Sequence, residues 1–92
     1  MIILALNCGS SSVKFKLYHW EKRQTLIKGE VERIGIIGSF IRFEIPGKSE
    51  EKAEKECHDH KTALNLILET LVDPKVSAIH SLTEIAAVGH RV

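Results

Sequence analysis

Hydrophobic and polar positions along the chain follow a pattern that predicts a sheet in its first half. Residues 2–6 form a continuous apolar run, which is typical of a central strand covered on both faces. From Val13 to Tyr18 apolar residues recur at every second position, which predicts a half-buried strand. Two further strands are expected, at about 25–34 and in the segment FIRFEI at 40–45. The first half of the chain is therefore expected to be a run of antiparallel strands.

The second half of the chain predicts one amphipathic helix. Residues 47–60 are almost wholly polar, with charges of both signs, so we expect a solvated loop or the frayed start of a helix. Asp59 can cap a helix that the dipeptide Asp73-Pro74 would end. The apolar residues of this helix share one face: Leu64, Ile67, Leu68 and Leu71. One helix lying on a sheet is the expected arrangement.

A last strand is expected at the end of the chain. Ser81 and Glu84 have the spacing of a capping box, which predicts a single helical turn. Residues 85–92 then follow as another buried strand. Because the chain stops inside this apolar pattern with no turn after it, we expect it to be cut within its domain. No internal repeat or linker divides the 92 residues, so one α+β unit is expected.

Charge and cysteine content narrow the classes of function. Thirteen Lys and Arg residues against twelve Asp and Glu leave a net charge of +1, too little to attract nucleic acid or an anionic membrane. The apolar opening MIILAL is too short for a membrane span and lacks the basic start of a signal peptide. Cys8 and Cys57 follow no disulfide or CxxC spacing, which predicts free thiols in a reducing compartment. We expect a cytoplasmic protein whose anion site, if it has one, is local.

The stretch NCGSSSVK, from Asn7 to Lys14, holds more polar side chains than a turn between two strands requires. Asn7 and three serines offer hydrogen-bond donors, Gly9 permits close approach of the backbone, and Lys14 brings a cation. These are the parts of a phosphate cradle. Neither GxxxxGK[ST] nor GxGxxG is present, so a β-hairpin rather than a helix would form it. The alternative is an ordinary serine-rich hairpin with a solvent-facing lysine.

Two strings near the ends of the chain resemble the signatures of one enzyme family. NCGSSSVKFKL resembles the N-terminal signature of acetate kinases, NxGSSSxKFxL. AVGHRV resembles the start of their second signature, which ordinarily continues with a further valine and His-Gly-Gly. The resemblance implies the superfamily of acetate and sugar kinases, actin and heat-shock chaperones. The implied fold class is α+β or α/β: a ribonuclease-H-like half-domain with mostly antiparallel strands, one amphipathic helix and a further strand. Residues 1–92 would be the N-terminal part of the first such domain, truncated at its C-terminal end.

The resemblance also implies a reaction, the reversible transfer of the γ-phosphoryl group of ATP to acetate, which gives acetyl phosphate and ADP. The complete enzyme would be a homodimer that uses ATP and magnesium and binds neither nucleic acid nor membrane. Most of the groups that stabilise the transition state would lie in sequence outside this chain. We therefore expect no catalytic residue within these 92 residues, and no turnover by them alone.

Six residues of this chain match site positions of the family. Asn7 is implied in the magnesium site. Arg91 matches the arginine that binds the substrate carboxylate, a role suited to a planar guanidinium with two parallel donors. Val92 matches an apolar wall of the acetate pocket. The residues implied in binding the ATP phosphates are Ser10, Ser12 and Lys14.

Three other functions remain open from the sequence. The chain could be a non-catalytic remnant or scaffold with at most weak phosphate binding, or part of a kinase for propionate or butyrate. It could also be a metal-binding or redox module built on Cys57, His58 and His60, although adjacent residues in one short segment rarely reach a single tetrahedral centre. We expect His60 to be a capping or packing residue and Cys8 to be structural.

Overall fold

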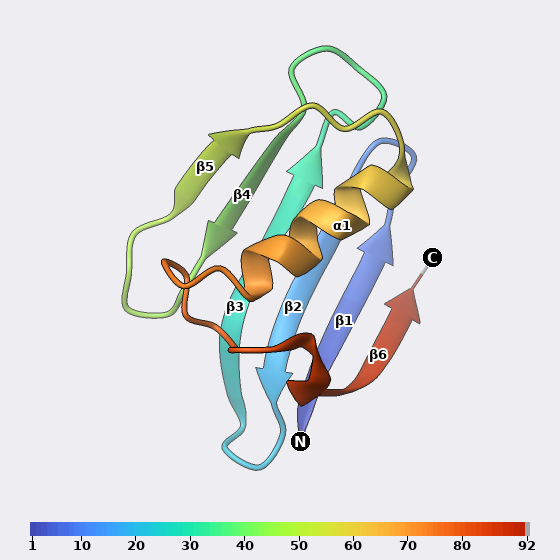
Figure 1. Ribbon diagram of the computed structural model, residues 1–92. Helices are drawn as coiled ribbons and strands as arrows, with labels where there is room; N and C mark the ends of the chain where they lie inside the picture. The colour runs from blue at the N-terminus through green and yellow to red at the C-terminus, as the bar shows by residue number, and fades with distance from the viewer. Residues whose placement is uncertain (92) are drawn as a thin grey trace.

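A mixed sheet of six strands carries a single α-helix across one of its faces (Figure 1). The computed structural model describes the backbone of residues 1–91 and the side chains of residues 1–90. The strand order is β5-β4-β3-β2-β1-β6, with β6 parallel to β1 and the other neighbouring pairs antiparallel. The elements are β1 (Ile2–Cys8), β2 (Val13–His19), β3 (Gln24–Glu32), β4 (Phe40–Glu44), β5 (Glu51–Glu54), α1 (His60–Leu71), the 3-10 turn η1 (Leu82–Glu84) and β6 (Ile85–Arg91). The expected fold class is thereby confirmed.

The antiparallel strands β1 to β4 lie where the apolar alternation predicted them. On β2, the buried Val13, Phe15 and Leu17 alternate with exposed lysines. The expectation that β1 would be covered on both faces is wrong, because Leu4 and Leu6 are buried while Ala5 and Asn7 are exposed. The reason is that α1 covers one face of the sheet only, and we call the opposite face the open face (Figure 1).

Two expectations about the sheet edges are wrong. Residues 47–60 contain the strand β5 instead of only a loop, and its four side chains are all exposed, so no apolar alternation marks it. Residues 86–90 of β6 are exposed instead of buried, with Val88 58% exposed. Helix α1 crosses β3, β2 and β1 and leaves β6 uncovered (Figure 1). Val92, the last residue of that predicted strand, lies outside the described residues.

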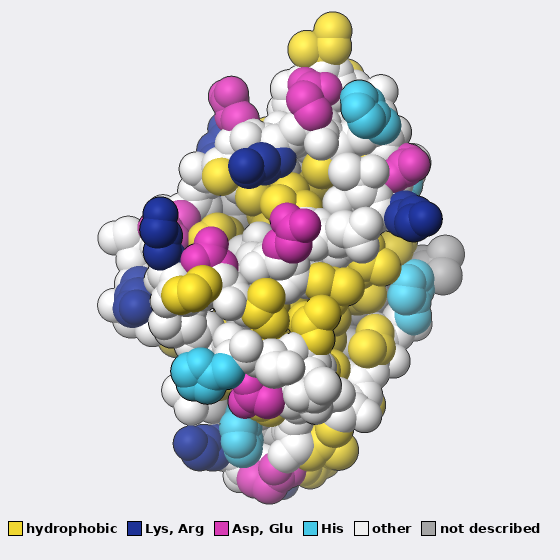
Figure 2. Space-filling model, in the orientation of Figure 1, with side chains coloured by type: hydrophobic (Ala, Val, Ile, Leu, Met, Phe, Trp, Pro, Cys, Tyr) yellow, Lys and Arg dark blue, Asp and Glu magenta, His cyan; other side chains and the backbone are white. Residues whose placement is uncertain are grey.

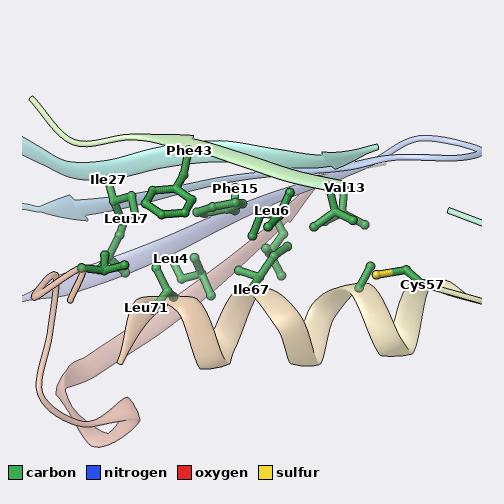
Figure 3. Close-up of a cluster of buried hydrophobic side chains, with 14 of the residues drawn as sticks. Leu4, Leu6, Val13, Phe15, Leu17, Ile27, Phe43, Cys57, Ile67 and Leu71 are labelled. Carbon is green, nitrogen blue, oxygen red and sulfur yellow. The ribbon is translucent and has the colours of Figure 1, made fainter. Parts of the chain in front are cut away.

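Helix α1 begins and ends close to the predicted positions. The Asp59 carboxylate accepts a 2.8 Å hydrogen bond from the Thr62 backbone N–H at the first turn, and this bond lowers the pKa of Asp59. The helix buries Ala63, Ile67 and Leu71 against the sheet. Figure 3 shows Ile67 and Leu71 facing Leu4, Leu6 and other apolar side chains of the strands.

The segment after α1 returns the chain to the sheet beside β1. Ser81 and Glu84 form the predicted capping box, and the backbone N–H groups of His80 and Ser81 that bond Glu84 lower its pKa. On the helix side of the molecule, hydrophobic side chains remain visible at the surface beside α1 (Figure 2). Within the described residues no helix is both long and apolar enough to cross a membrane.

Candidate functional site

The polar loop at residues 9–12 is the hairpin connection between β1 and β2. The backbone N–H of Gly9 donates a 2.8 Å hydrogen bond to the carbonyl of Ser12, which closes the loop. A Cβ atom at Gly9 would lie 2.9 Å from the Ser12 hydroxyl oxygen, so a larger residue would push that side chain out of place. The predicted β-hairpin is therefore present, with Ser10 exposed and Ser11 and Ser12 half-buried.

The register of three strands brings Asn7, Lys14 and Arg91 into one row across the sheet. Asn7 on β1 is the cross-strand partner of Lys14 on β2 and of Arg91 on β6. The side chains of Asn7 and Lys14 are exposed on the open face, because they alternate with the buried Leu6 and Phe15. For Arg91 the structure gives the backbone position only. The two distant signature strings thus meet at one place in the fold.

An open hollow of about 430 Å³ lies on this face beside the row. It is lined by Ala5, Leu6, Asn7, Lys14, Phe15, Lys16, Gly89 and His90. Ser10 and Ser12 lie in the loop at the ends of the strands that carry Asn7 and Lys14. Of the six residues singled out from the sequence, four lie in this hairpin, Arg91 has its backbone beside it, and Val92 falls outside the described residues.

Lys14 has an acidic cross-strand neighbour that is engaged elsewhere. Glu30 on β3 is paired in register with both Lys14 and Arg42. Its carboxylate forms an ion pair and hydrogen bond with the Arg42 guanidinium, which raises the pKa of Arg42. In the part of the chain that the structure describes, Lys14 forms no ion pair. Its ammonium group is accordingly available to an anionic ligand.

Two contacts that sequence reasoning missed hold the loop from outside. The ring nitrogen Nε2 of His60, the first residue of α1, lies 2.7 Å from the carbonyl oxygen of Gly9. The backbone N–H of Ile34, in the turn after β3, donates a 2.9 Å hydrogen bond to the carbonyl of Ser11. Of the two roles expected for His60, capping belongs to Asp59, whereas the half-buried His60 side chain reaches the loop. The separation of 51 residues between His60 and Gly9 left no local signal for this contact.

The loop between β1 and β2 has backbone N–H groups that are free to bind a ligand. Among the residues described, the amides of Ser10, Ser11 and Ser12 donate to no protein acceptor, whereas the carbonyls of Gly9, Ser11 and Ser12 each accept a hydrogen bond. A run of backbone N–H groups without protein acceptors beside a lysine is the chemistry of an anion cradle. This loop is accordingly suited to bind phosphate oxygens.

The residues implied in metal binding do not by themselves form a metal centre. Asn7 offers one amide oxygen, and Mg²⁺ prefers near-octahedral oxygen coordination with carboxylates and substrate phosphates. Within the described residues no three His, Cys, Asp or Glu side chains gather closely enough to hold a metal ion. Cys57 is buried in the core, and burial raises the pKa of its thiol. The sulfur of Cys8 lies 3.7 Å from Nε2 of His90.

The fold is that of an α/β half-domain, and its hairpin loop is suited to anions. The family model described as the acetokinase family matches residues 2–92. Acetate kinase of Geobacter metallireducens is 54% identical over 92 residues, which are all of this chain and 22% of that protein. The chain belongs to the acetokinase family. It spans about a fifth of the length of the curated relatives that it matches.

Solved structures agree with this assignment. The crystal structure of Porphyromonas gingivalis acetate kinase superposes with a TM-score of 0.94 and 44% identity, covering 99% of this chain and 23% of that one. A propionate kinase from Francisella tularensis superposes with a TM-score of 0.80 and 34% identity, covering 99% of this chain and 22% of that one. The resemblance found in the two signature strings is thereby confirmed at the level of the family.

Proposed function

We propose that this chain forms the phosphate-binding hairpin and one side of the substrate site of an acetate kinase. That enzyme transfers the γ-phosphoryl group of ATP reversibly to acetate, which gives acetyl phosphate and ADP. The observation that supports the proposal is the row of Asn7, Lys14 and Arg91 on three neighbouring strands, beside a loop that presents backbone donors. Residues 1–92 would be the N-terminal part of the first ribonuclease-H-like domain of that enzyme.

Each residue of the row has a role that its chemistry supports. Phosphoryl transfer to a carboxylate brings two anionic groups together, so positioning and neutralisation of charge are the main tasks of the protein. In this proposal Lys14 and the hydroxyls of Ser10 and Ser12 bind the phosphate oxygens of ATP. The guanidinium of Arg91 binds the acetate carboxylate through paired hydrogen bonds, with Val92 at the methyl group.

Magnesium would bind to this site together with ATP. When bound to the nucleotide, Mg²⁺ neutralises charge on its β- and γ-phosphates. Asn7 lies close enough in register to Lys14 to contribute an oxygen near those phosphates. The remaining ligands would come from the nucleotide, from water and from residues beyond this chain.

We propose further that the 92-residue chain alone binds the nucleotide phosphates but does not catalyse the reaction. The loop provides ground-state contacts with phosphate oxygens, whereas the groups that stabilise the transferring phosphoryl group would come from elsewhere in the enzyme. The complete enzyme would be a cytoplasmic homodimer. A kinase for propionate is the second candidate, because a propionate kinase shares this fold with a TM-score of 0.80.

Titration of the ¹⁵N-labelled chain with magnesium ATP, followed by amide NMR, tests the binding proposal. We expect the largest shifts at residues 7–14. Lys14→Ala should weaken binding by roughly 10- to 150-fold, because a hydrogen bond to a charged group contributes roughly 1.5–3 kcal/mol. Lys22→Ala is the matched control, since it removes an exposed lysine from the turn that follows the far end of β2. Dispersed amide peaks that do not move would contradict the proposal and leave a scaffold.

A separate assay tests the catalytic part. The chain is incubated with acetate, ATP and magnesium, and acetyl phosphate is trapped with hydroxylamine. We expect no acetyl phosphate above the background without protein. Steady formation of acetyl phosphate that Lys14→Ala abolishes would show that the chain is itself an enzyme. Parallel reactions with propionate would then decide between the two acyl substrates.

A further inference from the structure

His60 belongs to the helix that packs against the sheet. It is the first residue of α1, immediately after the capping residue Asp59. Three residues later Ala63 is fully buried, and Ile67 and Leu71 continue the same contact with the sheet. The start of the helix is therefore fixed relative to the strands, and with it the backbone of His60.

The contact from His60 to the loop is a hydrogen bond with a defined direction. A carbonyl oxygen can only accept, so Nε2 of the imidazole carries the proton and donates to the Gly9 carbonyl at 2.7 Å. The His60 side chain is half-buried and spans the space between the helix and the hairpin. No other hydrogen bond to the Gly9 carbonyl occurs among the described residues.

Because the peptide unit is planar, the orientation of the Gly9 carbonyl also determines the orientation of the Ser10 N–H. The Gly9–Ser10 peptide is trans and planar, so its N–H points opposite to its C=O. Because His60 holds the Gly9 carbonyl toward the start of α1, the Ser10 N–H points away from it. Without that bond the peptide plane could rotate and present its carbonyl, a repulsive group, to a phosphate.

We propose that His60 is a positioning residue for the phosphate loop: its imidazole fixes the Gly9–Ser10 peptide so that the Ser10 amide is directed at the bound phosphate. This inference rests on the proposed function as far as the phosphate is concerned. The fixed orientation of the peptide is a property of the chain without ligand. His60 itself touches neither phosphate nor substrate in this role.

Three variants separate the hydrogen bond from the bulk of the side chain. His60→Ala removes the donor. His60→Gln keeps an N–H donor at nearly the same distance from the backbone as Nε2. His58→Ala is the matched control, since His58 is an exposed histidine two residues earlier that forms no side-chain hydrogen bond with the described residues. All are studied in the 92-residue chain, well below their unfolding temperatures.

Two measurements are made on each variant: ¹⁵N order parameters of residues 9–12 without ligand, and affinity for magnesium ATP by amide shifts. In His60→Ala the Ser10 order parameter should fall from about 0.85 to below about 0.6. Affinity should fall about 5-fold, as expected for the loss of one neutral hydrogen bond. His60→Gln and His58→Ala should retain the wild-type values of both.

The outcomes separate the two proposals. Unchanged order at Ser10 in His60→Ala, or failure of His60→Gln to restore it, would overturn the positioning role. If His60→Ala loosens the loop while wild-type chain binds no magnesium ATP, the orienting role of His60 is supported and the phosphate-binding proposal is refuted. Loss of loop order and of affinity together, both restored by His60→Gln, would support both.

Discussion

Gly29 offers a sharp test of the packing between β3 and β4. It lies within β3, between Phe15 and Phe43 in the cross-strand row on the helix side of the sheet. Glycine weakens a strand by roughly 0.5–1 kcal/mol relative to alanine, so Gly29→Ala would be expected to stabilise the protein on propensity alone. The structure predicts the reverse. A Cβ atom at Gly29 would lie 2.8 Å from both Cα and Cβ of Phe43 and closer still to the Arg42 carbonyl oxygen.

The expected size of the effect follows from what the new methyl group would meet. Overpacking costs typically about 1–3 kcal/mol, and the upper end applies here because backbone atoms cannot rotate aside. After subtraction of the propensity gain, Gly29→Ala should lower the free energy of unfolding by about 2 kcal/mol. For a domain of this size that corresponds to a fall in Tm of roughly 8–16 °C.

Gly89→Ala is the matched control, because a Cβ atom at Gly89 on β6 would meet nothing within 4 Å. Both variants are unfolded by urea and by heat, followed by far-ultraviolet circular dichroism. Gly89→Ala should match the wild type or be slightly more stable. A Gly29→Ala variant as stable as the wild type would refute the steric reasoning, as would equal losses at both positions.

Three other predictions concern the core, the helix cap and the thiols. Ile67→Ala should lower the free energy of unfolding by about 2–5 kcal/mol in urea titrations, because Ile67 is fully buried between α1 and the sheet; an effect below 1 kcal/mol would contradict its place in the core. Hydrogen bonds lower the pKa of Asp59 in the folded state. As the pH falls, the Asp59 carboxylate is therefore protonated in the unfolded chain before it is protonated in the folded one. Stability should therefore fall as the pH drops below about 4, and Asp59→Asn, which still caps but does not titrate, should reduce that fall in acid unfolding curves. A thiol reagent should modify Cys8 but not Cys57 in the folded chain, because burial shields Cys57 and raises its pKa; modification of both at equal rates would show that Cys57 is accessible.

The strengths and failures of the sequence predictions have the same cause. Alternation located β2 because one of its faces is buried and the other is exposed, so period-two patterning appears in its residues. The same rule missed β5, whose four residues are all exposed. The apolar composition of β6 also led to the wrong prediction of a buried strand, because composition cannot distinguish a covered strand from one at an uncovered edge. The periodicity of apolar residues reflects which side chains are buried, and β5 and β6 bury few of theirs.

The candidate site was only partly accessible from sequence for a related reason. Local chemistry marked the hairpin from Asn7 to Lys14, since those residues are consecutive. The contact of His60 with Gly9 and that of Ile34 with Ser11 join residues far apart in the chain, and neither residue type signals its partner.

By itself the sequence determined the elements whose signals are local: the β1–β2 hairpin with its polar loop, the alternating strands, the capped helix and the two signature strings. Only the tertiary structure decided that a single helix leaves one sheet face open and that β6 lies parallel beside β1. It also decided that Arg91 is in register with Asn7. The ion pair between Arg42 and Glu30, the cross-strand neighbour of Lys14, was likewise decided by the tertiary structure. The physical reason is that capping, turn formation and burial periodicity act over a few residues. Strand register and loop anchoring depend instead on which distant surfaces meet.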